Sequence, residues 1–300
     1  MNDHLRWPLS APSPRWLVAL ALCLTSLPAS AEDGPPSPLV TPAPAPHIHA
    51  EPDAICPPRL DKVLAIGSST MGSPLGKMLE RTLTAKGFDT HRKATASSGL
   101  ARPDFFDWGH HARGLITQHD PDIVVVQLGS NDFQPVRFAE REVDLRRRMG
   151  DRPHLTRKHP DWVTVYGERI DELLQVLGGD RERLIIWIGP YAYYGDNALE
   201  QGPVIDQLLR DRLSTWVAKG GHARYINAWA DTFDARRGPL MRRRLPGRRG
   251  LVEIRSNDRI HLNVLGVEVL LRDPVVAELE ACRALVSPIA ATPNSDAPGP

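Results

Sequence analysis

The sequence predicts an α/β fold in which a parallel β-sheet lies between two layers of helices. Three short apolar runs, at residues 62–66, 123–128 and 184–188, have the length and composition of strands buried on both faces. Segments with helical spacing of apolar residues lie between these runs. Strands that alternate with helices form parallel sheets covered on both faces, so we expect a three-layer α/β/α domain.

The other elements of the domain follow in a regular order. Apolar residues between Leu75 and Leu83 recur at helical spacing, and Gly87 ends that helix. Residues 88–94 form a weaker strand candidate. A further strand is expected at residues 223–226. The remaining predicted helices cover residues 162–177, 204–217 and about 264–285.

Residues 1–31 have the pattern of a signal peptide. Positive charge precedes an apolar run at residues 16–24, and Ala29-Ser30-Ala31 supplies the small residues that a signal peptidase reads. An uncleaved anchor is the alternative, although the run is short for a bilayer span. We therefore expect an exported protein, periplasmic or secreted, with no stable membrane span after signal cleavage.

Three segments follow the predicted signal peptide. Residues 32–55 are rich in Pro and Ala and predict an extended linker. Residues 56–286 have the size of one α/β domain. Residues 287–300 share the composition of the linker and are expected to form a disordered tail.

Two cysteines remain after the predicted cleavage, Cys56 and Cys282, and they flank the domain. In an oxidising compartment such a pair is more often bridged than free, so we expect an intramolecular disulfide between them. Closing so long a loop stabilises the folded state by about 4–5 kcal/mol on the chain-entropy model, less any strain. The expected role of both cysteines is structural, and neither is expected to be catalytic.

Charge and composition argue against several classes of function. The formal net charge is +1, which gives no reason to expect nucleic acid or an anionic membrane as a partner. The histidines at positions 47, 49, 110 and 111 lack carboxylate or cysteine companions at ligand spacing, so no metal site is expected. The chain also has no glycine-rich phosphate loop, and no cofactor is expected.

Two polar segments allow more than one interpretation. Residues Arg236 to Arg249 include seven arginines, which form either a solvated loop or a rim that attracts an anionic substrate. Residues 133–160, which include Arg146-Arg147-Arg148, form a long insertion. Loops of this length are often functional, here as a lid over the site, or disordered.

Four short motifs carry the chemical information of the sequence. In chain order they are Gly67-Ser68-Ser69-Thr70, Ser98-Gly99-Leu100, Gly129-Ser130-Asn131-Asp132 and Asp258-Arg259-Ile260-His261. The first and third directly follow predicted strands, where parallel sheets bind ligands. Ser69 lies in a turn between strand and helix that exposes its hydroxyl, which needs a base to become a nucleophile. The spacing of Asp258 and His261 lets a carboxylate orient an imidazole base.

The remaining roles of an acyl-transfer site can also be assigned. The side-chain amide of Asn131 and the backbone N–H groups of Gly99 and Ser69 are candidate oxyanion donors. Each motif alone has a structural explanation, because Ser and Thr cap helices and Asn and Gly form turns. The presence of all the roles in one chain favours an esterase active site.

The four segments resemble blocks I, II, III and V of the SGNH/GDSL hydrolase superfamily, over about residues 62–283. This resemblance implies a flavodoxin-like fold, with Ser69 as nucleophile, Gly99 and Asn131 in the oxyanion hole, and Asp258 and His261 as the acid–base pair. Residues 97–108 also resemble a bacterial exported subgroup long known as a domain of unknown function. Ser68 replaces the aspartate of the usual Gly-Asp-Ser-Leu opening, which leaves the tuning of the nucleophile turn open.

Three functions are compatible with these features. We favour an exported serine esterase that removes a small acyl group, expected to be acetyl, from a cell-envelope or extracellular carbohydrate. An O-acyltransferase of the same fold would pass the acyl group to a sugar hydroxyl instead of water. A catalytically silent glycan-binding or assembly protein is the third, and the complete set of site residues argues against it.

Overall fold

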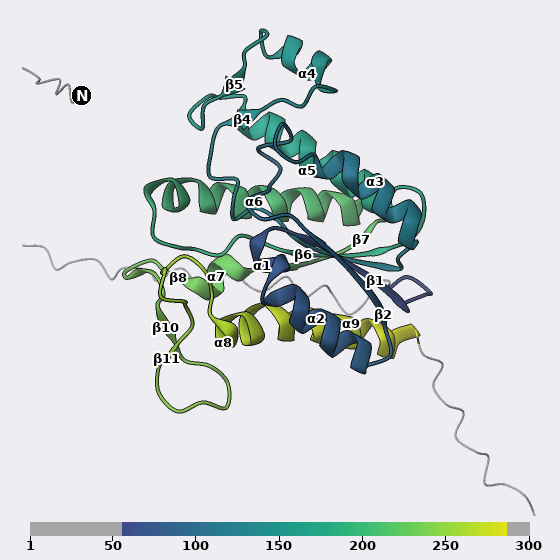
Figure 1. Cartoon of the computed structure of the whole chain (residues 1–300), viewed down its shortest axis with the longest axis vertical. Helices are drawn as coiled ribbons and strands as arrows, with labels where there is room; N and C mark the ends of the chain where they lie inside the picture. Colours follow the sequence, from purple (N-terminus) through teal and green to yellow (C-terminus); the bar gives the residue numbers. More distant parts are fainter. Residues whose placement is uncertain (1–55, 287–300) are drawn as a thin grey trace, which may run out of the picture. The chain divides into compact units, whose positions relative to one another are not determined.

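The computed structural model describes residues 56–286, which contain a five-stranded parallel sheet with helices on both faces (Figure 1). The strand order is β2-β1-β3-β6-β7, the order of flavodoxin-like folds. These strands are Lys62–Gly67 (β1), Asp89–Ala94 (β2), Ile123–Gln127 (β3), Leu184–Ile188 (β6) and His222–Ile226 (β7). The predicted three-layer α/β/α architecture is confirmed. The predicted signal peptide, linker and tail lie outside the described residues.

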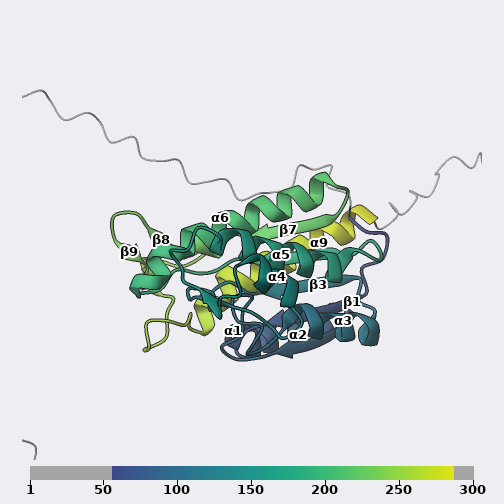
Figure 2. The same cartoon turned by 90° about the horizontal axis from the view of Figure 1, so that it is seen from above.

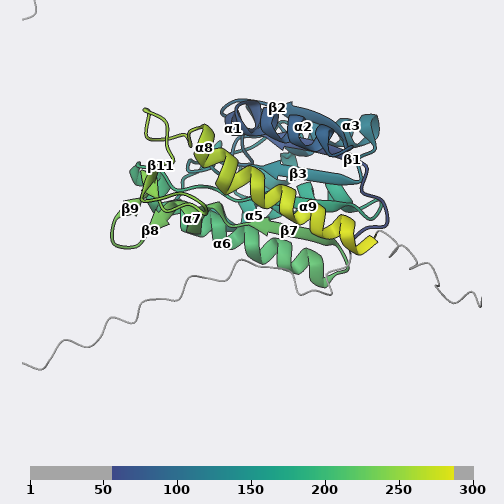
Figure 3. The ribbon, with the colours of Figure 1, turned by 90° about the horizontal axis from the view of Figure 1, so that it is seen from below.

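Each face of the sheet has its own layer of long helices (Figures 1 and 2). One face is covered by Trp108–His119 (α3), Trp162–Gly178 (α5) and Asp196–Ala218 (α6). The other is covered by Leu75–Ala85 (α2) and Asp273–Val286 (α9), which Figure 3 shows in front of the sheet. Successive side chains of β1 point to opposite faces of the sheet. Leu64 packs on the face covered by α3, α5 and α6, and Val63 packs on the face covered by α2 and α9.

Shorter elements lie between the core elements. The short helices are Ser69–Gly72 (α1), Val143–Arg148 (α4), Ala228–Thr232 (α7) and Val264–Val267 (α8). Three small antiparallel pairs are Val136–Arg137 (β4) with His154–Leu155 (β5), Phe233–Asp234 (β8) with Gly238–Pro239 (β9), and Arg242–Arg243 (β10) with Val252–Glu253 (β11). The insertion at residues 133–160 is therefore folded around β4, β5 and α4.

Two of the predicted helices differ from the observed ones. Helix α6 begins at Asp196 instead of residue 204 and carries Pro203 in its interior, a residue that normally marks a helix start. The last helix is divided by a π-helical turn at Glu268–Arg272, between α8 and α9. Helix α3 was not predicted, because its sequence, WGHHARGLITQH, has no strong apolar periodicity.

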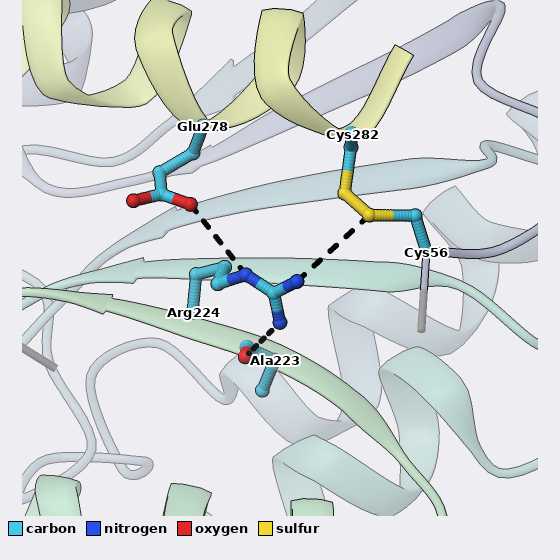
Figure 4. Close-up of a disulfide and its surroundings, with 5 residues drawn as sticks. All are labelled: Cys56, Ala223, Arg224, Glu278 and Cys282. Atoms are coloured by element: carbon cyan, nitrogen blue, oxygen red, sulfur yellow. Dashed lines mark hydrogen bonds and ion pairs between the residues drawn. A yellow bond between two sulfur atoms is a disulfide. The ribbon is translucent and has the colours of Figure 1, made fainter. Parts of the chain in front are cut away.

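The predicted disulfide between Cys56 and Cys282 is present, with 5.5 Å between the two Cα atoms (Figure 4). It ties the segment before β1 to helix α9. Arg224 of β7 lies beside it, 3.8 Å from the Cys56 sulfur, and pairs with Glu278 at 3.5 Å. Burial lowers the pKa of Arg224. Of the helices within residues 56–286, none is long and apolar enough to cross a membrane.

Candidate active site

The register of the sheet brings three of the four motifs to the same edge. Gly67, the last residue of β1, pairs with Ala94 on β2 and with Gln127 on β3. The chain therefore leaves these neighbouring strands at one level. Ser69 follows the end of β1, and Asn131 follows the end of β3. This is the edge at which parallel α/β sheets bind ligands.

Ser69, His261 and Asp258 form a connected chain of side chains. The hydroxyl oxygen of Ser69 lies 3.4 Å from Nε2 of His261. The other ring nitrogen, Nδ1, lies 2.7 Å from a carboxylate oxygen of Asp258. This is the order of contacts in a serine–histidine–aspartate triad, in which the carboxylate orients the ring and the ring takes the serine proton.

A tight turn fixes the carboxylate of Asp258 against the histidine. Its second oxygen accepts hydrogen bonds from the backbone N–H groups of Ile260 and His261, at 2.9 and 3.0 Å. Arg259, between Asp258 and His261, has a φ of +60°, a left-handed conformation that is uncommon for a residue other than glycine. The hydrogen bond from His261 holds the pKa of Asp258 below its usual value.

The structure brings Ser69, and not its neighbour Ser68, to the histidine. The Ser68 side chain is buried, and its hydroxyl donates to Oε1 of Gln127 at 2.9 Å. Its backbone N–H donates to the Gln127 carbonyl at 3.2 Å. Ser68 thus joins the ends of β1 and β3, whereas Ser69 begins α1 and is half-buried. The residue that replaces the usual aspartate has a structural contact of its own.

Asn131 and Gly99, the expected oxyanion residues, lie on two loops that contact each other. The side-chain nitrogen of Asn131 donates to the carbonyl of Ser98 at 3.0 Å, which leaves one amide hydrogen for another acceptor. Gly99 is buried, and a β-carbon at this position would overlap the carboxylate of Asp132. The close contact with Asp132 therefore requires glycine at position 99, in addition to the proposed role of its backbone N–H.

A buried polar network behind this loop was not identified from the sequence. Asp132 is fully buried and accepts hydrogen bonds from the backbone N–H of Ala101 at 2.7 Å and the hydroxyl of Tyr166 at 2.9 Å. Burial raises the pKa values of both Asp132 and Tyr166. Arg169 donates to the carbonyl of Leu100 at 2.9 Å and pairs with a buried glutamate on the insertion. Asp132 stood in a recognised motif, but nothing in the sequence marked Tyr166 or Arg169 as more than helix residues.

Arg255 supports the loop that carries His261 in a similar way. It is buried, and its guanidinium donates to the carbonyls of Ile260 at 2.9 Å, Leu240 at 2.8 Å and Ala192. Burial lowers the pKa of Arg255. The three carbonyl oxygens accept hydrogen bonds from its guanidinium group and so reduce the cost of burying it. Arg255 therefore connects the turn that carries His261 to the loop after β6.

Two tyrosines from the loop after β6 lie around the turn that carries Ser69. The Tyr191 hydroxyl lies 3.0 Å from the hydroxyl of Thr70. Tyr193 donates to the carbonyl of Ser130 at 3.1 Å, and burial raises the pKa of Tyr193 to about 12. Within residues 56–286, no group of three or more His, Cys, Asp or Glu side chains is placed to hold a metal ion.

A family model described as "Protein of unknown function (DUF459)" matches residues 62–277. The chain belongs to this family. DUF459 is SGNH-like, in agreement with the motifs described above. No curated protein sequence shows significant similarity to this chain.

Several solved structures resemble this member of DUF459. An α/β hydrolase enzyme, LAE5, from the metagenome of Lake Arreo in Spain is 16% identical over 74% of this chain and 96% of that chain, with a TM-score of 0.48. The psychrotrophic esterase EstA from Pseudoalteromonas is 12% identical over 76% and 100%, with a TM-score of 0.45. Axe2, an acetylxylan esterase from Geobacillus stearothermophilus, is 15% identical over 73% and 94%, with a TM-score of 0.42.

Proposed function

We propose that this protein is an exported serine esterase that removes a small acyl group from a cell-envelope or extracellular carbohydrate. The acyl group that we propose is acetyl. The observation that carries the proposal is the contact chain Ser69–His261–Asp258, with separations of 3.4 and 2.7 Å. A half-buried serine beside an oriented imidazole is the arrangement that activates a hydroxyl for attack on a carbonyl.

The first half of the reaction transfers the acyl group to the enzyme. Nε2 of His261 takes the proton of Ser69 as the serine oxygen bonds to the ester carbonyl carbon. The carbonyl oxygen becomes an anion, for which the N–H groups of Ser69 and Gly99 and the amide of Asn131 are the proposed donors. The bond to the sugar oxygen then breaks, and His261 gives its proton to that departing oxygen, which leaves as a hydroxyl group.

The second half restores the enzyme. Water loses a proton to His261 and attacks the acyl-serine, which passes through a second oxyanion. The carboxylic acid leaves, and the proton returns to the oxygen of Ser69. The carboxylate of Asp258 orients the ring and stabilises its charged form in both halves, without taking the proton itself.

The openness of the site supports a short acyl group on a large carrier. The side chains of His261 and Asp258 are each 45% exposed, so these two residues lie at the surface of the domain. An acetyl group that projects from a polymer reaches such a site without entering a deep tunnel. The disulfide Cys56–Cys282 supports an oxidising compartment outside the cytosol.

Incubation of the purified protein with an aryl acetate, with and without a sugar acceptor, tests the proposal. A serine esterase releases acetate at a rate that the sugar does not change. An acyltransferase yields an acetylated sugar and releases the phenol faster when the sugar is present. Absence of turnover in both reactions would leave a catalytically silent protein and refute the proposal.

A further inference from the structure

The arginine-rich segment beside the triad differs from the rest of the surface in its charge balance. Residues 233–263 contain nine arginines and no lysine, against three acidic residues. The whole chain has a formal net charge of only +1. The positive charge is therefore concentrated in one part of the domain, and that part carries His261.

The acidic residues near this segment already have partners. Glu253 pairs with Arg242 at 3.1 Å, and Asp258 is held by His261. Asp231, on α7, pairs with Arg243 at 2.6 Å. Asp234 accepts the backbone N–H groups of Arg236 and Arg237 at 2.9 and 3.0 Å.

Six arginines of the segment remain uncompensated. Their side chains are exposed and make no hydrogen bond or ion pair with any residue of the described domain: Arg236, Arg237, Arg244, Arg248, Arg249 and Arg259. Unneutralised like charges repel one another and oppose folding. Their concentration beside the triad is explained if an anion compensates them from outside the chain.

The second arginine-rich segment provides a contrast within the same molecule. On the insertion, Arg146 pairs with Asp151 at 3.8 Å, Arg147 with Asp144 at 2.9 Å, and Arg148 with Glu168 at 2.7 Å. Those arginines are neutralised by the fold itself. A run of arginines therefore need not lack acidic partners, and the six uncompensated arginines at residues 233–263 contrast with the run at residues 146–148.

Two hairpins carry five of the six uncompensated arginines. Arg236 and Arg237 lie at the turn between β8 and β9, and Arg244, Arg248 and Arg249 lie in the loop between β10 and β11. Both hairpins project beyond the carboxyl ends of the central strands, at the end of the sheet where α1 begins (Figures 1 and 3).

The second hairpin is continuous with the triad loop. After β11, the backbone N–H of Ser256 donates to the carbonyl of His261 at 2.9 Å, and the N–H of Asn263 donates to the carbonyl of Ile254 at 3.0 Å. Arg259 lies between the triad residues Asp258 and His261 in sequence. The arginine-rich segment therefore continues along the chain into the turn that carries His261.

We propose that the two hairpins and Arg259 form a binding surface for a carboxylate-bearing polysaccharide, which is the carrier of the ester. This inference rests on the proposed esterase function for the ester, but the binding itself requires no catalysis. The guanidinium group is planar and matches a carboxylate with two parallel hydrogen bonds. Arginines spread over two hairpins fit a chain of repeated charges better than one small anion.

Binding is measured with the full chain and unacetylated polygalacturonate as the probe. The test variants are Arg236→Gln/Arg237→Gln and Arg248→Gln/Arg249→Gln, one for each hairpin. The matched control is Lys77→Gln/Arg81→Gln, which removes two exposed charges from α2. We expect each test variant to weaken binding about tenfold or more and the control to leave it unchanged. Binding should also weaken as salt rises from about 0.1 M to about 1 M, because the Debye length shortens from about 10 to about 3 Å.

Activity measurements separate this inference from the proposed function. On a neutral aryl acetate the test variants should keep the wild-type kcat/KM, whereas on O-acetylated polygalacturonate their KM should rise about tenfold. If no ester is hydrolysed but polygalacturonate binding depends on the hairpin arginines, the function fails and the surface stands.

The surface assignment has clear contrary outcomes. Equal loss of binding in the control variant would show an effect of net charge only. Unchanged binding in both test variants would overturn the inference. Binding to poly(U) or to phosphatidylglycerol vesicles, with none to polygalacturonate, would replace the polysaccharide with a nucleic acid or a membrane. Melting curves of all variants confirm that the proteins compared are folded.

Discussion

The carboxylate of Asp132 occupies the space that a β-carbon on residue 99 would need, so Gly99 and Asp132 fit together only because residue 99 is glycine. The same carboxylate accepts the N–H of Ala101 at 2.7 Å. Asp132 comes from the loop after β3, next to Asn131, and Gly99 comes from the loop after β2. Two proposed oxyanion donors therefore depend on one buried contact for their relative placement.

Gly99→Ala should disturb this contact and lower both stability and activity. Overpacking of a well-packed site costs about 1–3 kcal/mol, and here the neighbour is a fixed carboxylate. Gly114→Ala is the control, because Gly114 is exposed in α3 and an added β-carbon meets nothing within 4 Å. That change should raise stability by up to about 1 kcal/mol. Chemical denaturation gives the free energy of unfolding of both variants. Equal stability of the two would contradict the role given to Asp132.

The core strands were predictable because their sequences are apolar throughout. Strands β1, β3 and β6 are buried on both faces, and such strands read as continuous apolar runs. The start of α6 was not predictable in the same way, because Pro203 inside the helix resembles a helix start. Helix α3 was missed because its sequence is largely polar and contains two glycines.

The site was predictable where its residues lie close together in sequence. Asp258 and His261 are three residues apart and meet within one turn. Tyr166 and Arg169 act on the loops at residues 98–101 and 129–132 from helix α5. Their contacts arise from tertiary packing, and a single sequence contains no local pattern that reports them.

Ser69→Ala should lower turnover of an aryl acetate by about four to six orders of magnitude and leave the melting temperature nearly unchanged, because triad members fail as a unit. Ser68→Ala should show the opposite pattern. It removes the buried hydrogen bond to Gln127, worth about 0.5–1.5 kcal/mol, and leaves Ser69 in place. Kinetics and melting curves of both variants distinguish the two serines. Loss of turnover in Ser68→Ala alone would reverse the assignment.

Asp258→Asn should lower kcat by about 10³–10⁴-fold, because the ring of His261 loses the carboxylate that orients it.

The same change should alter how stability depends on pH. The pKa of Asp258 is lowered in the folded state, so its contribution is present above the ordinary value of about 4 and is lost as pH falls through the lower folded value. Wild-type protein should therefore lose more stability than Asp258→Asn between about pH 5 and about pH 2. Parallel loss in both would contradict a stabilising contact between Asp258 and His261.

Removal of the disulfide should reduce stability more than it reduces activity. The bridge joins residues 226 positions apart, and closing a loop of that order contributes about 4–5 kcal/mol on the chain-entropy model. Cys56→Ser/Cys282→Ser should therefore unfold at a lower denaturant concentration, while the folded fraction keeps its kcat because the bridge lies outside the triad. Intact mass after alkylation without reductant provides the direct measurement on the wild-type chain. Two modified thiols would show that the bridge is absent from the purified protein.

Asn131→Ala tests the oxyanion hole, and its two expected effects have different origins. Attack by Ser69 creates an anion that does not exist in the bound substrate, so loss of one donor should lower kcat about 100- to 1000-fold and leave KM nearly unchanged. The side chain also donates to the carbonyl of Ser98, at 3.0 Å, so a stability loss of about 1 kcal/mol is expected as well.

Asn131→Asp provides the electrostatic comparison. It places a negative charge beside the developing oxyanion and should lower kcat further than Asn131→Ala. A residue with a purely structural role predicts a different result, in which stability falls and the folded fraction keeps its kcat. Kinetics at a temperature well below the melting point of each variant separate the two roles. An unchanged kcat in folded Asn131→Ala would remove Asn131 from the oxyanion hole and leave only the N–H groups of Ser69 and Gly99 as proposed donors.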